Sequence, residues 1–340
     1  MRFSSLAVTV VFLSLIGSAF GKPSILPNWG GGGWGRGTVE RHASLFHTAR
    51  PSRVLGLFSH WDRCDTPVTV RAGALFLRRD YGSNAPIVTN GPGGPTIVGA
   101  DHLNGGYAPG LHASARCRVG RFYLEGRYMQ GWNFDDSLNR ISGATDFVDG
   151  VAVAPGINHR VIAGTDFQSA DLNMLSTPLH RTRLVSGFRF IRLDDQLQNR
   201  VPAFPNSNFD SRTTNDLFGW QLGLDGDYGP FVDWLPLSLN GFVKAGAYYA
   251  NSRSVMNLNL ADVEDSNSSN LALAAELGVS LAYQFTHCLK MEVGYQVLFM
   301  DGIAVAAEQF STTDLDPLTN SINHGSMLIH GAQVNIVGTF

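Results

Sequence analysis

The chain has 340 residues, a formal net charge of −3 and only 16% charged residues, whereas about 25% is usual for a soluble domain. A hydrophobic content of 44% excludes an intrinsically disordered protein. The near-balanced charge gives no reason to expect nucleic acid as a partner.

Residues 1–21 have the parts of a secretory signal peptide. Arg2 supplies the positive charge, residues 6–16 form the apolar stretch, and Ala19 and Gly21 are the small residues of a cleavage site. The apolar stretch is shorter than the roughly 20 residues that a membrane-spanning helix needs. We therefore expect an exported chain, and no later stretch predicts a transmembrane helix.

Residues 22–66 are rich in Gly and Arg and show no periodicity. Gly30, Gly32 and Gly35 match the spacing GxGxxG, but a dinucleotide site needs a strand before the motif and a helix after it. Neither pattern is present. We predict a flexible leader here and a single structured domain at residues 67–340.

The domain at residues 67–340 shows alternation of apolar and polar residues ten times, which is the period of a strand with two different faces. One stretch, residues 182–193, is ambiguous, because Arg192 shares its parity with Leu184 and Phe188. The stretches are residues 68–77, 107–117, 121–132, 169–175, 182–193, 216–228, 237–250, 271–285, 289–299 and 330–340.

The gaps between these stretches alternate between long and short. The long gaps are residues 78–105, 134–166, 197–212, 253–268 and 303–324. Antiparallel strands with long loops at one end and short turns at the other are typical of an outer-membrane β-barrel. An even number of strands places both ends of the domain on the short-turn side.

Strand length separates this interpretation from a soluble β-sandwich. Many of the stretches exceed ten residues, whereas strands of globular proteins have about 5–6 residues and tilted membrane-spanning strands need about 9–11. The apolar parity of residues 271–285 and 289–299 carries no charge, as a lipid-facing surface requires. We predict an all-β transmembrane antiparallel β-barrel of about ten strands in the bacterial outer membrane, with long outer loops and short periplasmic turns. A secreted soluble β-protein is the alternative.

Three segments carry a resemblance to a known family. "VRAGALFLRRD", "LVSGFRFIRLDDQL" and "KMEVGYQVLFMDGIAVAAEQ" look like segments of the BBP7 (planctomycete-type) outer-membrane β-barrel family, over residues 67–340. The resemblance implies a porin-like barrel without a catalytic motif, and it supplies no site residues. The last strand ends on Phe340, which resembles the C-terminal signal that the barrel-insertion machinery of bacterial outer membranes recognises.

If the apolar parity faces lipid, the other parity lines the lumen, with eight basic and four acidic residues. We consider two functions: a narrow pore whose cationic lining favours small solutes or anions, and a barrel plugged by salt bridges whose outer loops bind partners. The predicted lining residues are Arg71, Arg116, Arg121, Arg127, Arg183, Arg189, Lys244, Lys290, Glu125, Asp225, Glu276 and Glu292.

Enzymatic activity is not expected. The acidic and histidine residues nearest to a catalytic pattern are Asp101–His102 and Asp135–Asp136, in predicted loops. No GxSxG or HExxH motif is present. The histidines have no metal-ligand spacing, so we predict neither a metal nor a cofactor.

Three cysteines, Cys64, Cys117 and Cys288, allow one disulfide bond and one free thiol in an exported chain. Their spacing does not decide which two are paired.

Overall fold

The computed structural model describes residues 68–82, 85–91, 94–103, 106–143, 146–148, 151–152, 155–200, 209–229, 236–258, 262–309 and 322–340. No helix among them is long and apolar enough to cross a membrane. The predicted signal peptide (1–21) and leader (22–66) lie outside the described residues.

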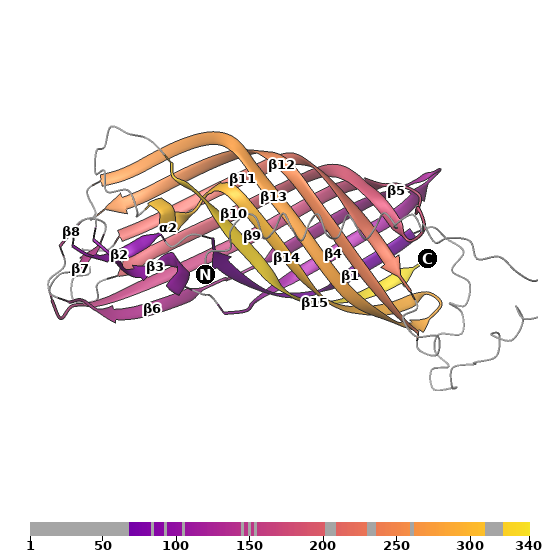
Figure 1. The fold of residues 1–340 in the computed structure, drawn as a ribbon, viewed down its shortest axis with the longest axis horizontal. Coiled ribbons are helices and arrows are strands. Elements are labelled where there is room, and N and C mark those ends of the chain that lie inside the picture. Colours follow the sequence, from indigo (N-terminus) through magenta and orange to yellow (C-terminus); the bar gives the residue numbers. More distant parts are fainter. Residues whose placement is uncertain are drawn as a thin grey trace, which may run out of the picture. The chain divides into compact units, whose positions relative to one another are not determined.

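Ten antiparallel strands form a closed barrel, as the alternation predicts (Figure 1). Each strand pairs with its neighbour in the order β10-β11-β12-β13-β14-β15-β1-β4-β5-β9, and the additional pairing of β9 with β10 closes the ring. The strands are β1 (Val68–Tyr81), β4 (Ala108–Val119), β5 (Phe122–Gly131), β9 (Asn158–Leu175), β10 (Thr182–Arg200), β11 (Phe209–Tyr228), β12 (Leu237–Leu258), β13 (Asp262–Thr286), β14 (Leu289–Ala304) and β15 (His324–Thr339).

The last strand closes onto the first. β15 pairs with β1 from Thr69↔Thr339 to Tyr81↔Met327. Beyond that ladder, the Phe340 N–H donates to the Val68 carbonyl oxygen at 2.8 Å. The ring therefore leaves no open edge between its first and last strands, as a sheet in lipid requires.

Several strands run further than the alternation predicts. β10 has 19 residues, β12 has 22 and β13 has 25. Within the predicted loops 197–212 and 253–268, residues 197–200, 209–212, 253–258 and 262–268 are paired strand, so the loop prediction is wrong for these residues. In these extensions polar residues occupy the outward parity, which removes the apolar signal that marks a strand in the sequence.

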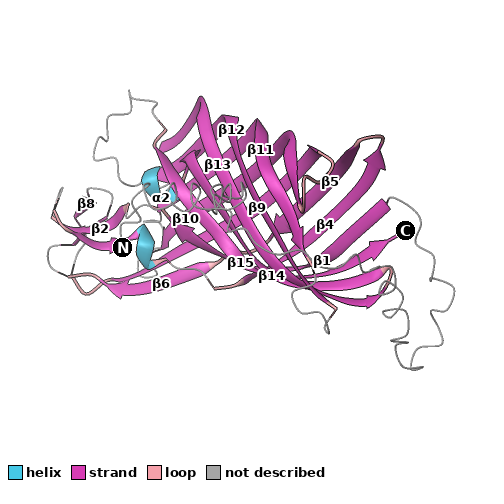
Figure 2. Ribbon diagram, turned by 45° about the vertical axis from the view of Figure 1, so that its right-hand side comes forward, coloured by secondary structure: helices cyan, strands magenta, loops and turns pink. Residues whose placement is uncertain are grey.

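Smaller elements gather at the long-loop end, opposite the C-terminus (Figures 1 and 2). Four short strands form a second sheet, and β6 (Asp136–Ile141) extends the barrel by pairing with β9. The remaining elements are β2 (Pro86–Asn90), β3 (Thr96–Gly99), β7 (Asp146–Val148), β8 (Val151–Ala152), the 3-10 helix η1 (Ala100–His102) and the helix α2 (Ala306–Gln309).

The cysteines differ in state. Cys288 is disulfide-bonded, whereas Cys117 in β4 carries a free thiol. Pairings that involve Cys117 are therefore excluded.

An apolar belt covers the outer face of the barrel along its short-turn half. Large apolar side chains of all ten strands are exposed there, including Val70, Leu111, Leu124, Leu172, Phe188, Phe218, Tyr249, Leu277, Val293 and Ile336. Toward the long-loop end the outward parity becomes polar, with Arg78, Asp166, Arg192, Asp216 and Arg253.

Candidate functional site: the barrel interior

The interior of the barrel reverses its polarity halfway along each strand, and β10 shows this most clearly. Its inward parity carries Arg183 and Arg189 in the short-turn half and becomes apolar at Ile191 and Leu193, both 0% exposed. Its outward side chains change in the opposite sense, from Phe188 to Arg192. The parity of residues 182–193 is ambiguous in the sequence because the two patterns meet there.

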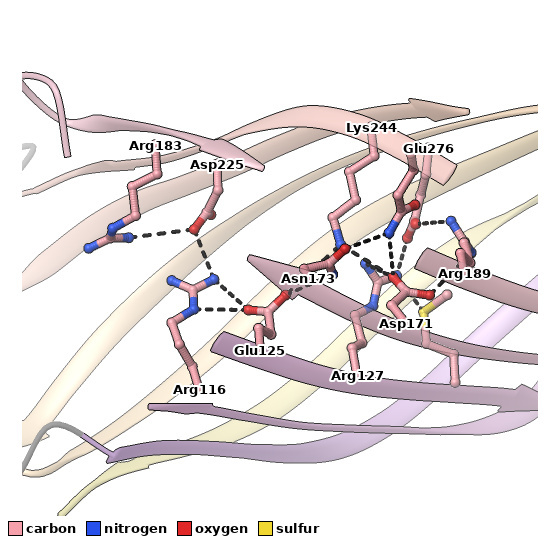
Figure 3. Close-up of polar contacts among 12 residues, drawn as sticks. Arg116, Glu125, Arg127, Asp171, Asn173, Arg183, Arg189, Asp225, Lys244 and Glu276 are labelled. Atoms are coloured by element: carbon pink, nitrogen blue, oxygen red, sulfur yellow. Dashed lines mark hydrogen bonds and ion pairs between the residues drawn. The ribbon is translucent and has the colours of Figure 1, made fainter. Parts of the chain in front are cut away.

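The short-turn half of the interior contains a buried ion-pair network (Figure 3). At its centre Asp171 of β9 and Glu276 of β13 share Arg189 of β10, at 3.2 Å and 2.7 Å. Arg127 of β5 also contacts Glu276, and the Lys244 ammonium of β12 lies 3.4 Å from Asp171. Because these charges are almost fully buried, each depends on its partners for stability.

A second group of charges lies nearer the short turns. Arg116 donates to Glu125 at 2.6 Å and lies 2.8 Å from Asp225. Arg183 contacts the same Asp225 carboxylate at 3.5 Å. Lys244, at 4.0 Å from Glu125, connects this group to the central one.

Inward-facing glycines make room for these polar side chains. In the strand register Gly187 of β10 lies between Asn173 of β9 and Gln221 of β11. A Cβ at Gly187 would lie 2.5 Å from the Asn173 Oδ1, and across this gap the Gln221 Nε2 donates to that oxygen at 2.8 Å. The glycine therefore lets side chains two strands apart form a hydrogen bond.

The same arrangement occurs at Gly73 of β1, which pairs with His112 of β4 on one side and Asn335 of β15 on the other. The His112 Nδ1 lies 3.0 Å from the Asn335 Oδ1. Both side chains are buried and line a cavity of about 50 Å³ in this half of the barrel. Arg71, Arg127, Lys244, Phe242, Glu292 and Gln333 also line it.

The long-loop half of the interior is apolar. All ten strands contribute to one buried cluster, for example through Leu77, Ala108, Met129, Phe167, Leu193, Leu217, Tyr248, Ala274, Leu298 and Ile329. Ile87, Val98, Leu103, Phe134 and Ala307, from the segments between the strands, belong to the same cluster. Buried apolar side chains from all ten strands and from these segments therefore form one layer inside the barrel.

A buried ion pair between Arg79 and Asp195 lies within the apolar layer. Arg79 of β1 and Asp195 of β10 are 3.1 Å apart, and both side chains are 0% exposed. Asp195 also accepts from the Thr165 hydroxyl at 2.6 Å and from the Ala306 N–H at 2.9 Å. The pair therefore joins three barrel strands to the start of α2.

The last residue of β14, which leads into α2, is held by side chains of β11. The Asn215 Nδ2 donates to the Ala304 carbonyl oxygen at 2.7 Å, and the Ala304 N–H donates to the Asn215 Oδ1 at 2.7 Å. The Thr213 hydroxyl donates to the same carbonyl at 3.0 Å. These bonds keep α2 against the apolar layer.

Most of the predicted lining residues lie inside the barrel on the expected parity. Lys290 is half-buried on the same face of β14 as Glu292. Arg121 is different, because it lies in the turn after β4 with an exposed side chain, so the prediction that it lines the lumen is wrong. Residues on the inward parity with burial or ion pairs are Arg71, Arg116, Glu125, Arg127, Arg183, Arg189, Asp225, Lys244, Glu276 and Glu292.

Sequence reasoning missed two features of the interior. Asp171, on the polar parity of β9, was available to the pattern analysis but was not included among the lining residues. The apolar layer was missed altogether, because alternation alone assigns apolar residues to the lipid side. The sequence signal for this layer is the point beyond the apolar belt of each strand at which the apolar residues change from one parity to the other.

The residues considered for catalysis do not come together in one catalytic site. Asp101 and His102 are neighbours in η1 and contact each other at 3.1 Å with half-exposed side chains. Asp135 precedes β6 and Asp136 begins it. Among the described residues no group of His, Cys, Asp or Glu could hold a metal ion. The absence of enzymatic activity stays a prediction.

Comparisons with known proteins give no close relative. No family model and no curated protein matches the chain. The outer membrane protease OmpT from Escherichia coli has 10% identity and a TM-score of 0.49, covering 81% of this chain and 97% of its own. The translocator domain of the autotransporter NalP from Neisseria meningitidis has 9% identity and a TM-score of 0.43, covering 81% and 89%. At these values the similarities carry no argument, and the barrel stands on its own strand pairing.

Proposed function

We propose that the protein is an outer-membrane β-barrel whose short-turn half crosses the bilayer and whose lumen is closed by the apolar layer in its long-loop half. The exposed apolar belt supports the membrane location, because a folded soluble protein rarely exposes so large a contiguous apolar surface. The polar lining beneath the belt supports it as well, since transmembrane barrels alternate apolar outward and polar inward.

The buried apolar layer is the observation that carries the closed lumen. Ions need a hydrated path, and a narrow apolar constriction expels water. Here the layer receives side chains from all ten strands and from the segments between them. On this proposal the barrel is a non-conducting anchor, and the elements at the long-loop end form the surface that meets partners outside the cell.

Planar-bilayer recording of residues 22–340 tests this proposal. We expect folded protein to give no discrete conductance steps under conditions in which an open porin does. Folding is verified independently by heat-modifiable migration on a gel. Repeatable ohmic steps from folded wild-type protein would contradict the closed lumen and favour the cationic pore.

A gated narrow pore is the second candidate, and the anchoring of α2 favours it. Only a few side-chain hydrogen bonds hold Ala304 to Thr213 and Asn215. Under this alternative, the double variant Thr213→Ala, Asn215→Ala would show intermittent conductance steps in a planar bilayer, whereas the wild type shows none. Continued silence of the folded double variant would count against a gate at this place.

The proposal also includes the family of the chain, its export and its insertion into the outer membrane. Membership of the BBP7 family rests on the three segments of the sequence analysis. Export and insertion by the barrel-insertion machinery rest on the N-terminal pattern and on the strand that ends at Phe340. Deleting residues 1–21 should keep the chain out of the outer membrane, and cell fractionation measures this.

A further inference from the structure

The cavity in the short-turn half has unpartnered polar atoms in its wall. His112, Asn335 and Arg127 all line it and are 5%, 1% and 8% exposed. In each of these side chains one nitrogen, the His112 Nε2, the Asn335 Nδ2 and the Arg127 Nε, has no hydrogen-bond partner. Buried polar atoms in native proteins nearly always have a partner, so these three nitrogens are available to bind an occupant of the cavity.

The hydrogen-bond roles of the three atoms differ. The Asn335 Oδ1 can only accept, so the His112 Nδ1 beside it carries the hydrogen, and the Nε2 of the neutral ring is then an acceptor. The Asn335 Nδ2 and the Arg127 Nε are donors. An occupant must therefore accept at least two hydrogen bonds and donate one.

The charges of the wall favour an anion. Arg127 and Lys244 line the cavity, whereas their closest carboxylate partners, Glu276 and Asp171, are not part of the lining. The carboxylates that do line it, Glu125, Asp225 and Glu292, each contact an arginine. Arg71 and Arg116 line the cavity too, so its wall contains four cationic and three anionic side chains.

We propose that this cavity binds hydrogen phosphate, which enters from the short-turn end. At neutral pH this ion has oxygens that accept from Asn335 and Arg127 and an O–H group that donates to His112. The volume of about 50 Å³ is suitable for a small oxyanion, since one water needs roughly 10–15 Å³. Sulfate has the same shape but no O–H at this pH, so it lacks the donor that His112 requires. This inference goes beyond the proposed function and does not depend on whether the pore conducts.

Isothermal titration of residues 22–340, folded in phosphate-free detergent, tests the proposal. We expect saturable binding of phosphate and weaker binding of sulfate. His112→Leu should weaken phosphate binding by about tenfold or more, because about one hydrogen bond to a charged group is lost. His330→Leu is the matched control, because His330 lies on the outer face of β15 beside Asp80, and it should bind phosphate as the wild type does.

Two results would overturn the proposal. One is the absence of saturable phosphate binding by the folded wild type, which would mean that water alone fills the cavity. The other is equal affinity for phosphate and sulfate in the wild type and in His112→Leu, which would place binding elsewhere. The wild-type measurement decides even if His112→Leu does not fold. Neither result bears on conductance, so failure of this inference is separate from failure of the closed lumen.

Discussion

The two halves of the barrel have opposite chemistry, although the same ten strands run through both. In the short-turn half charged side chains face inward and apolar ones face outward, as in a membrane protein. In the long-loop half apolar side chains fill the interior and charged ones face outward, as in a soluble protein. Under the proposed function, the level at which each strand reverses is where its surroundings change from lipid to water.

The comparison also shows two ways of filling a ten-stranded interior. The short-turn half uses ion pairs and amides arranged around inward glycines, and it leaves a cavity. The long-loop half uses packed apolar side chains together with inserted segments, and its polar links include Arg79–Asp195 and the bonds of Asn215 to Ala304. Substitutions in the two halves should therefore lower the free energy of unfolding by different amounts and for different physical reasons.

Removing a shared carboxylate should have the largest effect. Glu276→Leu leaves Arg127 and Arg189 without a main partner, and uncompensated buried charge costs about 3–5 kcal/mol. Urea unfolding in lipid vesicles measures this loss in the free energy of unfolding. Asp265→Asn on the same strand breaks an exposed pair with Arg253 and should leave the stability unchanged. Equal stability of both variants would show that the network does not stabilise the barrel.

Truncation in the apolar layer should come next. Leu193→Ala removes a side chain that is 0% exposed, and a buried Leu→Ala change costs about 2–5 kcal/mol. The same urea titration measures the difference. Leu179, which is 73% exposed in the turn after β9, is the matched leucine, and Leu179→Ala should be close to neutral. A negligible cost at Leu193 would argue against a packed layer.

A charge in the apolar belt tests the lipid boundary. Leu277→Arg, on the outer face of β13, should cost about 2–4 kcal/mol in vesicles, as expected for Arg near the bilayer midplane. Asn267→Arg lies on the same face of the same strand, in the exposed extension beyond the belt, and should cost little. If the two arginines cost the same, the proposed change from lipid to water along β13 is wrong.

The inward glycines should show a smaller effect. An alanine Cβ at position 187 would lie 2.2 Å from the Leu172 carbonyl oxygen, and overpacking of this kind costs about 1–3 kcal/mol. Gly126→Ala is the control, because a Cβ there meets nothing within 4 Å. Unfolding midpoints of the two alanine variants compare them directly. A cost at position 126 that equals the one at 187 would point to a general effect of glycine on these strands instead of a local one.

The number and order of the strands could be predicted because the membrane belt produces a regular alternation, as in residues 271–285. The strand ends could not, since the extensions past Arg192 and Asn251 lose the apolar outward parity and resemble loops. The inward charges were largely predictable from parity. Their partners were only partly predictable. Asp171 and Arg189 are opposite each other on the consecutive strands β9 and β10, whereas Glu276 comes from β13 and meets Arg127 and Arg189 only because the sheet closes into a barrel.

Thiol accessibility tests the contrast between the two halves most directly. Gln333→Cys lies in the wall of the cavity and Ala272→Cys in the apolar layer, each made in a Cys117→Ser background. In vesicles treated with a small membrane-impermeant thiol reagent, we predict modification of the cysteine at 333 and protection of the cysteine at 272. Equal modification of both would mean that water crosses the whole lumen, and it would contradict a lumen closed in the long-loop half.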